Sequence, residues 1–249
     1  MGRIKLKDVG LSEECREAYK SLRTNIQFCG EDKKVIVFTS CTPDEGKSTV
    51  VLQLAISLAE ANRKVLIVDA DLRKSIMTGN FEIDGEIKGL THYLSGLASL
   101  DEAIQVIGSN NLDIIFAGPI PPNPAELLSD RLFKEMIKKC RETYDYVLVD
   151  TPPLGSVIDS AVVASECDGA AIVIEAEVIS YRFVQDIKEQ LEKSGCPILG
   201  TILNKIDLRQ QRYYGGYYSR KYGRYYGRYY GRYYGYGYYG NSKKKKKKK

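Results

Sequence analysis

The sequence has no tryptophan and only one histidine, His92, so a site built from paired histidines is excluded. Its six cysteines are scattered and include no C-x-x-C pair, which argues against a zinc cluster or a disulfide framework. No apolar run approaches the roughly 18 residues needed to cross a bilayer, and no secretory signal is visible. These absences predict a cytoplasmic protein that meets a membrane only through its surface or a partner.

Two further absences are confined to the C-terminal segment, residues 209–249, which has neither acidic residues nor Val, Ile, Leu, Met or Phe. Without such side chains a segment cannot bury enough surface to offset its conformational entropy, so we expect a disordered tail. The tail instead contains Gly, Arg, seven terminal lysines and fourteen tyrosines. The tyrosines are Tyr213, Tyr214, Tyr217, Tyr218, Tyr222, Tyr225, Tyr226, Tyr229, Tyr230, Tyr233, Tyr234, Tyr236, Tyr238 and Tyr239.

Charge is divided unevenly between this tail and the rest of the chain. Fourteen of the 37 Lys and Arg residues lie in 209–249, and the 23 that remain accompany all 32 acidic residues. The overall charge of +5 therefore combines an acidic body with a strongly basic tail. Such a tail attracts anionic lipid, nucleic acid or an acidic protein surface.

Ahead of the tail, short continuous apolar runs alternate with segments of helical periodicity. Strands are predicted at 35–39, 65–68, 112–116, 146–149, 169–174 and 198–203, and helices at 49–61, 130–143, 156–165 and 180–194. Continuous β-branched runs indicate strands covered on both faces. The fold class is therefore α/β, with a mostly parallel central sheet between helices. Ligands of such folds bind at the carboxyl ends of the strands.

A phosphate-binding loop follows the first of these strands. Gly46-Lys47-Ser48 matches the end of the P-loop motif, although Cys41 stands where its first glycine would be. Backbone N–H groups at such a helix start attract phosphates. Lys47 would reach the β- and γ-phosphates, and the Ser48 hydroxyl would bind Mg²⁺.

Three carboxylates come at the ends of predicted strands. Asp69 and Asp71 end the run that begins at Val65, and Asp150 ends the run before Thr151-Pro-Pro153. Mg²⁺ takes few carboxylates alongside phosphate oxygens and water, and Asp71 and Asp150 suit that need. Asp69 is then left to accept a proton from an attacking hydroxyl group, either of water or of a phenol.

These motifs resemble the bacterial tyrosine kinases of capsule and exopolysaccharide synthesis, which share a P-loop NTPase-like fold. The resemblance also includes the run Ala117-Gly-Pro-Ile-Pro-Pro-Asn-Pro-Ala-Glu-Leu-Leu128 and the tyrosine-rich tail. It implies an ATP-dependent protein-tyrosine kinase with Lys47 and Asp69 as catalytic residues and the tail tyrosines as phosphoacceptors. It implies Mg²⁺ at Ser48, Asp71 and Asp150. The implied nucleotide-binding residues are Thr42, Pro43, Asp44, Glu45, Gly46, Lys47, Ser48, Thr49 and Asn204.

The resemblance also predicts three parts of the chain. Residues 1–30 form a helical segment for self-association, 31–208 the kinase domain and 209–249 the tail. The family's E-x-x-R-x-x-R motif reads Glu17, Lys20 and Arg23 here, so a ring-like homo-oligomer is expected, although lysine lacks arginine's planar contact. A second departure is Asp44, where the family usually has glycine.

Partners follow from the same resemblance. Members without a transmembrane segment work with a separate membrane-spanning activator, which would bring this chain to the inner face of the cell membrane. A cognate tyrosine phosphatase would reverse the modification. The implied role is regulation of capsular or exopolysaccharide synthesis and export.

Two alternatives remain at this point. A partitioning or septum-site ATPase shares the fold, but those proteins carry a lysine where Thr42 stands and have no tyrosine tail. A polyanion-binding protein would use the tail itself, because Arg and Tyr interleaved with Gly are typical of single-strand binding segments, and the lysine run suits anionic lipid.

Overall fold

A computed structural model describes residues 4–7, 10–108 and 111–206. The predicted tail, including every tail tyrosine, lies outside these residues. Contacts group residues 1–205 into one compact unit. Within the described residues, no helix is long and apolar enough to span a bilayer.

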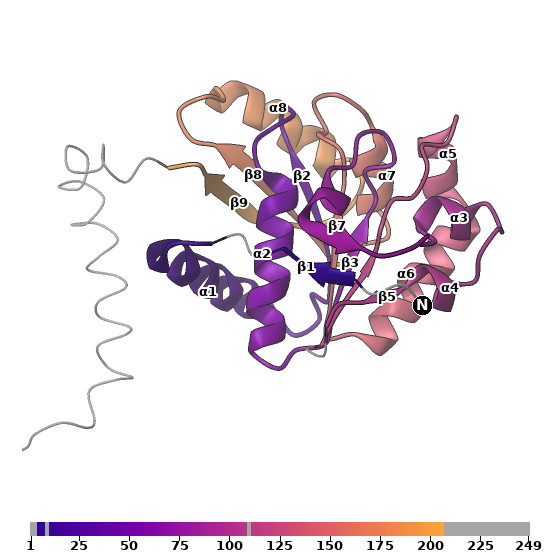
Figure 1. Ribbon diagram of the computed structural model, residues 1–249. Helices are drawn as coiled ribbons and strands as arrows, with labels where there is room; N and C mark the ends of the chain where they lie inside the picture. Colours follow the sequence, from indigo (N-terminus) through magenta and orange to yellow (C-terminus); the bar gives the residue numbers. More distant parts are fainter. Residues whose placement is uncertain (1–3, 8–9, 109–110, 207–249) are drawn as a thin grey trace, which may run out of the picture. The chain divides into compact units, whose positions relative to one another are not determined.

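The strands form a seven-stranded central sheet with the order β5-β6-β3-β7-β2-β8-β9 (Figure 1). They are β2 (Val35–Ser40), β3 (Val65–Asp69), β5 (Gln105–Val106), β6 (Leu112–Ile115), β7 (Tyr146–Asp150), β8 (Gly169–Glu175) and β9 (Ile198–Asn204). Every pairing is parallel except that of β5 with β6. The predicted α/β class with a mostly parallel sheet is confirmed.

Helices cover both faces of this sheet. They are α1 (Glu13–Phe28), α2 (Lys47–Glu60), α3 (Leu90–Leu94), α4 (Leu100–Ala103), α5 (Pro124–Ser129), α6 (Arg131–Thr143), α7 (Asp159–Ala164) and α8 (Tyr181–Glu192). Figure 1 shows α2 in front of the sheet with α1 beside it. Alternate residues of β2 enter two core layers, Ile36 and Phe38 with α2, and Val35 and Val37 with α6, α7 and α8.

A small antiparallel sheet stands apart from the central one. It joins β1 (Ile4–Leu6) to β4 (Phe81–Ile83), which follows a 3₁₀ turn at Met77–Asn80. The register pairs Ile4 with Ile83 and Leu6 with Phe81, which brings the start of the chain against the segment after β3.

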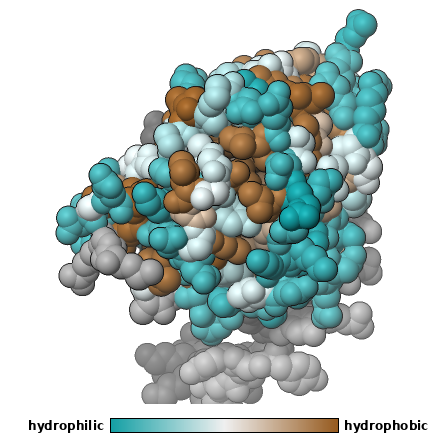
Figure 2. Space-filling view, turned by 90° about the vertical axis from the view of Figure 1, so that its right-hand side faces the viewer, coloured by the Kyte–Doolittle hydropathy of each residue, from teal (hydrophilic) through white to brown (hydrophobic). Residues whose placement is uncertain are grey.

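One face of the unit, at the right of Figure 1, carries hydrophobic residues at its centre with hydrophilic residues around them (Figure 2). The elements at that side include α3 and α5. Leu97 lies just after α3 and Ile120 lies before α5, and both side chains are largely exposed. Ile120 belongs to the run that resembles the kinases of polysaccharide synthesis.

Candidate active site

The loop between β2 and α2 turns through two left-handed residues. Gly46 has φ of 82° and Asp44 has φ of 65°. Glycine adopts this region freely, and aspartate is among the few other residues that tolerate it. The Asp44 side chain is exposed, so the residue that departs from the family pattern fits the turn without entering the core.

The ammonium group of Lys47, the first residue of α2, lies at the edge of the sheet where β7 ends. Its Nζ forms an ion pair with Asp150 Oδ1 and donates to Ser48 Oγ at 3.3 Å. The Lys47 side chain is 7% exposed and that of Asp150 1%. Asp150 is close because β7 pairs with β2, with Phe38 opposite Asp150. The structure therefore brings Lys47, Ser48 and Asp150 together as the sequence predicts.

Asp69 ends β3 directly opposite Asp150 and is completely buried. Its Oδ2 accepts a hydrogen bond from Ser75 Oγ, and its Oδ1 accepts one from Asp71 N at 3.3 Å. Burial, followed by the Asp150 charge, raises the pKa of Asp69 to about 7, against the lowering effect of Ser75. A carboxyl group with a pKa near neutrality suits a general base.

Asp71 lies at the cavity beside the loop. This cavity has a volume of about 420 Å³ and is lined by loop residues, Ser48, Asp71, Arg73 and the segment after β7. Asp71 Oδ1 accepts from the N–H groups of Arg73 and Lys74 at 3.2 and 3.0 Å. Asp69 and Asp150 are not among the residues that line the cavity, because they are buried beside it.

The donor set around this cavity fits a hard cation. The Ser48 hydroxyl and the Asp150 carboxylate share the Lys47 ammonium, and Asp71 lines the same cavity as Ser48. Hydroxyl and carboxylate oxygens are ligands that Mg²⁺ prefers, with phosphate and water completing the shell.

Two contacts were not predicted from the sequence. Ser75 reaches Asp69 across six residues, and Arg73 binds the buried Asp159 through Nε and Nη2 at 2.7 and 2.9 Å. Asp159 is the first residue of α7, the helix that follows β7 in the sequence. No spacing pattern joins these residues, so only the fold reveals them.

The residues expected to promote self-association do not all face outward. Lys20 Nζ pairs with Glu17 Oε1 at 2.7 Å on the exposed side of α1. Arg23 instead donates from Nη1 to the Ser57 carbonyl of α2 at 2.7 Å. Arg23 thus contacts a helix of its own subunit.

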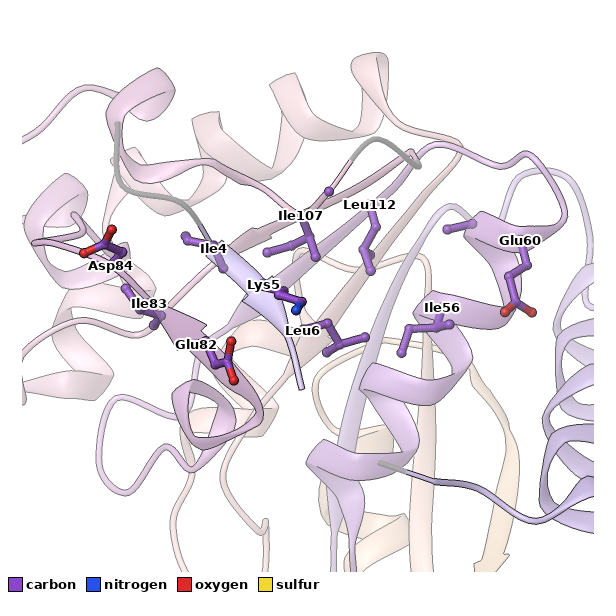
Figure 3. Close-up of a pocket in the computed structure, with 12 residues that line it drawn as sticks. Ile4, Lys5, Leu6, Ile56, Glu60, Glu82, Ile83, Asp84, Ile107 and Leu112 are labelled. Carbon is purple, nitrogen blue, oxygen red and sulfur yellow. The ribbon is translucent and has the colours of Figure 1, made fainter. Parts of the chain in front are cut away.

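A larger hollow of about 780 Å³ lies away from these residues (Figure 3). Aliphatic side chains of β1, β4, α2 and β6 line it, and Glu60, Glu82 and Asp84 are the carboxylates there. None of the predicted nucleotide or metal residues lines this hollow. The phosphate-loop cavity is therefore the one that the predicted site residues identify.

A phosphate loop, a buried lysine and strand-end carboxylates on a parallel sheet define a P-loop nucleotide-binding protein. Residues 33–195 match the family model described as an AAA domain. The chain is 44% identical to tyrosine-protein kinase CpsD of Streptococcus agalactiae over 209 residues, covering 83% of this chain and 91% of that protein. The chain belongs to the bacterial tyrosine-protein kinases, and it is a protein-tyrosine kinase.

Solved structures agree with this assignment. The kinase domain of the Escherichia coli tyrosine kinase Etk superposes with a TM-score of 0.74 at 35% identity, covering 78% of this chain and 76% of that one. The full Etk protein is 35% identical over 200 residues, covering 80% of this chain and 27% of Etk, so this chain corresponds to a part of Etk. The septum site-determining protein MinD of Pyrococcus horikoshii gives a TM-score of 0.58 at 29% identity, covering 68% of this chain and 69% of MinD. The septum-site alternative thus has the weaker support.

Proposed function

We propose that this kinase transfers the γ-phosphoryl group of ATP to tyrosines of its own C-terminal segment and so regulates capsular or exopolysaccharide synthesis. Fourteen tyrosines between residues 213 and 239 supply the acceptors. The observation that supports the chemistry most is the arrangement of Lys47, Asp150 and Asp69, a buried ammonium and two buried carboxylates beside the phosphate loop.

Each residue has a role in the transfer. The phenol oxygen bonds to the γ-phosphorus while the bond from that phosphorus to the β,γ-bridging oxygen breaks, and ADP leaves. Asp69 accepts the phenol proton, and Lys47 stabilises charge on the β- and γ-phosphate oxygens. Ser48, Asp71 and Asp150 would hold a Mg²⁺ ion, which would supply positive charge to offset that of the phosphates.

The proposal requires a rearrangement on nucleotide binding. Asp69 is completely buried, and the Lys47 ammonium is bound to Asp150. Phosphates entering the loop would compete with Asp150 for this ammonium, and Asp150 would then be free to help hold the cation. One oxygen of Asp69 must then become accessible to a phenol.

Mass spectrometry of the tail after incubation with Mg-ATP tests the function. We expect tyrosine phosphate in the tail of the unmodified chain and its loss in Lys47→Met and in Asp69→Ala. Circular dichroism of both variants controls for folding. Phosphorylation of Asp69→Ala at the wild-type rate would contradict the role of Asp69. A wild-type tail that stays unphosphorylated would contradict self-phosphorylation.

We also propose a membrane-spanning activator as a partner, which would recruit the kinase to the inner face of the cell membrane. Exposed Leu97 and Ile120 provide apolar surface for such a contact or for a ring of subunits. The lysine run adds attraction to anionic lipid. Adding the activator's cytoplasmic segment should raise the autophosphorylation rate, and full activity of the chain alone would contradict this dependence.

A further inference from the structure

The phosphate loop is tied internally by the carboxylate of Glu45. This residue is 1% exposed. Its Oε1 accepts from Thr42 N and from Thr42 Oγ1 at 3.0 Å, and its Oε2 accepts from Glu175 N at 2.9 Å. A buried carboxylate is tolerated only when such donors surround it. Glu45 therefore joins the start of the loop to the end of β8.

Side chains at the end of β9 bind two backbone carbonyl groups of the same loop. Asn204 Nδ2 donates to the Glu45 carbonyl at 2.9 Å, and Lys205 Nζ donates to the Asp44 carbonyl. Lys205 Nζ also binds Glu175 Oε2 at 2.8 Å, which fixes the ammonium against β8. Two successive loop carbonyls are thus held by two successive residues of the chain.

Holding these carbonyls also orients the N–H groups that follow them. In a planar trans peptide the carbonyl and the next N–H point in opposite directions. Fixing the carbonyls of Asp44 and Glu45 therefore turns the N–H groups of Glu45 and Gly46 away from β9. Among the described residues neither N–H has an acceptor, and both residues line the phosphate-loop cavity.

Gly46 shows how closely the Asn204 amide approaches the loop. A Cβ built at Gly46 would lie 2.3 Å from Asn204 Nδ2, and the residue has φ of 82°. Glycine is needed both for the turn and for the approach of the asparagine amide. The amide nitrogen of Asn204 is thereby directed at the loop backbone.

We propose that Glu45, Asn204 and Lys205 form a clamp that positions the phosphate loop to receive nucleotide phosphates. Asn204 and Lys205 are positioning residues, since they act through the loop backbone. For Asn204 this role differs from the base contact that the family resemblance implies. This proposal depends on nucleotide binding at the loop, but it does not depend on which group accepts the phosphoryl.

Binding of three ligands to the full-length chain separates these roles. ATP, GTP and inorganic tripolyphosphate share the phosphates but differ in the base. Calorimetry should show that each variant weakens all three ligands by a similar factor. We expect about fivefold for the neutral hydrogen bond lost in Asn204→Ala and about tenfold for the charge-assisted one lost in Lys205→Met. Lys205→Arg should restore most of the affinity, because it keeps a cationic donor. In autophosphorylation assays the loss should appear mainly as a raised KM for ATP.

Matched controls make the result decisive. Lys188→Met removes an exposed ion pair with Glu192 on α8 and should leave all affinities unchanged. Thermal melting reports folding, and the 43% exposed Lys205 side chain makes Lys205→Met the safer variant if Asn204→Ala does not fold. Unchanged tripolyphosphate binding in both variants would overturn the clamp. A loss for ATP alone in Asn204→Ala would assign that residue to the base. Since binding needs no phosphoryl transfer, a failed kinase assay would not affect this test.

Discussion

At the scale of single residues, the contacts around the phosphate loop join either the ends of neighbouring strands or residues that only packing brings together. Lys47, Ser48 and Asp150 meet as expected, because a P-loop and strand-end carboxylates are local patterns whose positions the parallel sheet fixes. Ser75 and Asp159 have no such pattern. Their partners, Asp69 and Arg73, lie six and 86 residues away, so their roles depend on packing that spacing does not encode.

Asp44 gives the first residue-scale prediction. Asp44→Gly should tighten ATP binding about two- to fivefold, because it removes a negative charge from a loop that binds phosphates. The left-handed φ of 65° suits glycine equally well, so the free energy of unfolding should change by less than about 1 kcal/mol. Titration of ATP at low and high salt checks this. A gain that does not shrink with salt would contradict the electrostatic cause.

Arg73 supports a second prediction. It forms a two-point contact with Asp159, whose side chain is fully buried, while the Arg73 side chain is 40% exposed. Arg73→Met leaves that carboxylate unpaired and should lower the free energy of unfolding by about 2 kcal/mol in a urea titration. Arg131→Met, which removes an exposed pair with Glu135, is the control and should change it by less than about 0.5 kcal/mol. Equal effects in both variants would show that burial of Asp159 is unimportant.

At the scale of elements, the central strands were predictable and the small ones were not. Runs such as Val35–Ser40 are buried along their whole length, so composition alone marks them. The strands β1, β4 and β5 have two or three residues each and exist through pairing with distant partners. The helix α7 begins at Asp159, three residues later than expected, because residues 154–156 form a turn after Pro152 and Pro153.

The contact between α1 and α2 leads to an element-scale prediction. The carbonyls of the last helical turn lack partners within their own helix, and Arg23 caps that of Ser57 in α2 with a cation. Arg23→Met should therefore lower the free energy of unfolding by about 1–2 kcal/mol. Lys20→Met removes only an exposed pair and should cost less than about 0.5 kcal/mol.

Urea titrations check this pair of variants at protein concentrations low enough for sedimentation to show only monomers. Sedimentation at higher concentration then reports assembly separately. If Arg23→Met altered assembly while leaving monomer stability unchanged, its role would lie between subunits rather than between α1 and α2.

At the scale of the whole molecule, charge separates the body from the tail. The fourteen basic residues of 209–249 accompany a body with 23 basic and 32 acidic residues. The proposed modification acts on this balance, because each phosphotyrosine adds about −1.5 to −2 charges. About seven to nine phosphates would cancel the tail's positive charge, and modification of all fourteen tyrosines would reverse it.

This reversal predicts a change of assembly. A basic tail is attracted to the acidic body of a neighbouring subunit, whereas a phosphorylated tail is repelled by it. We expect native mass spectrometry to show oligomers before incubation with Mg-ATP and smaller species as the number of phosphates passes about seven. Lys47→Met, treated identically, should remain assembled.

Raising the ionic strength should weaken the unphosphorylated assembly, since exposed charges are screened beyond roughly 10 Å at 0.1 M salt. An oligomer that persists with all tail tyrosines phosphorylated would show that contacts within the folded body, and not the tail's charge, hold the subunits together.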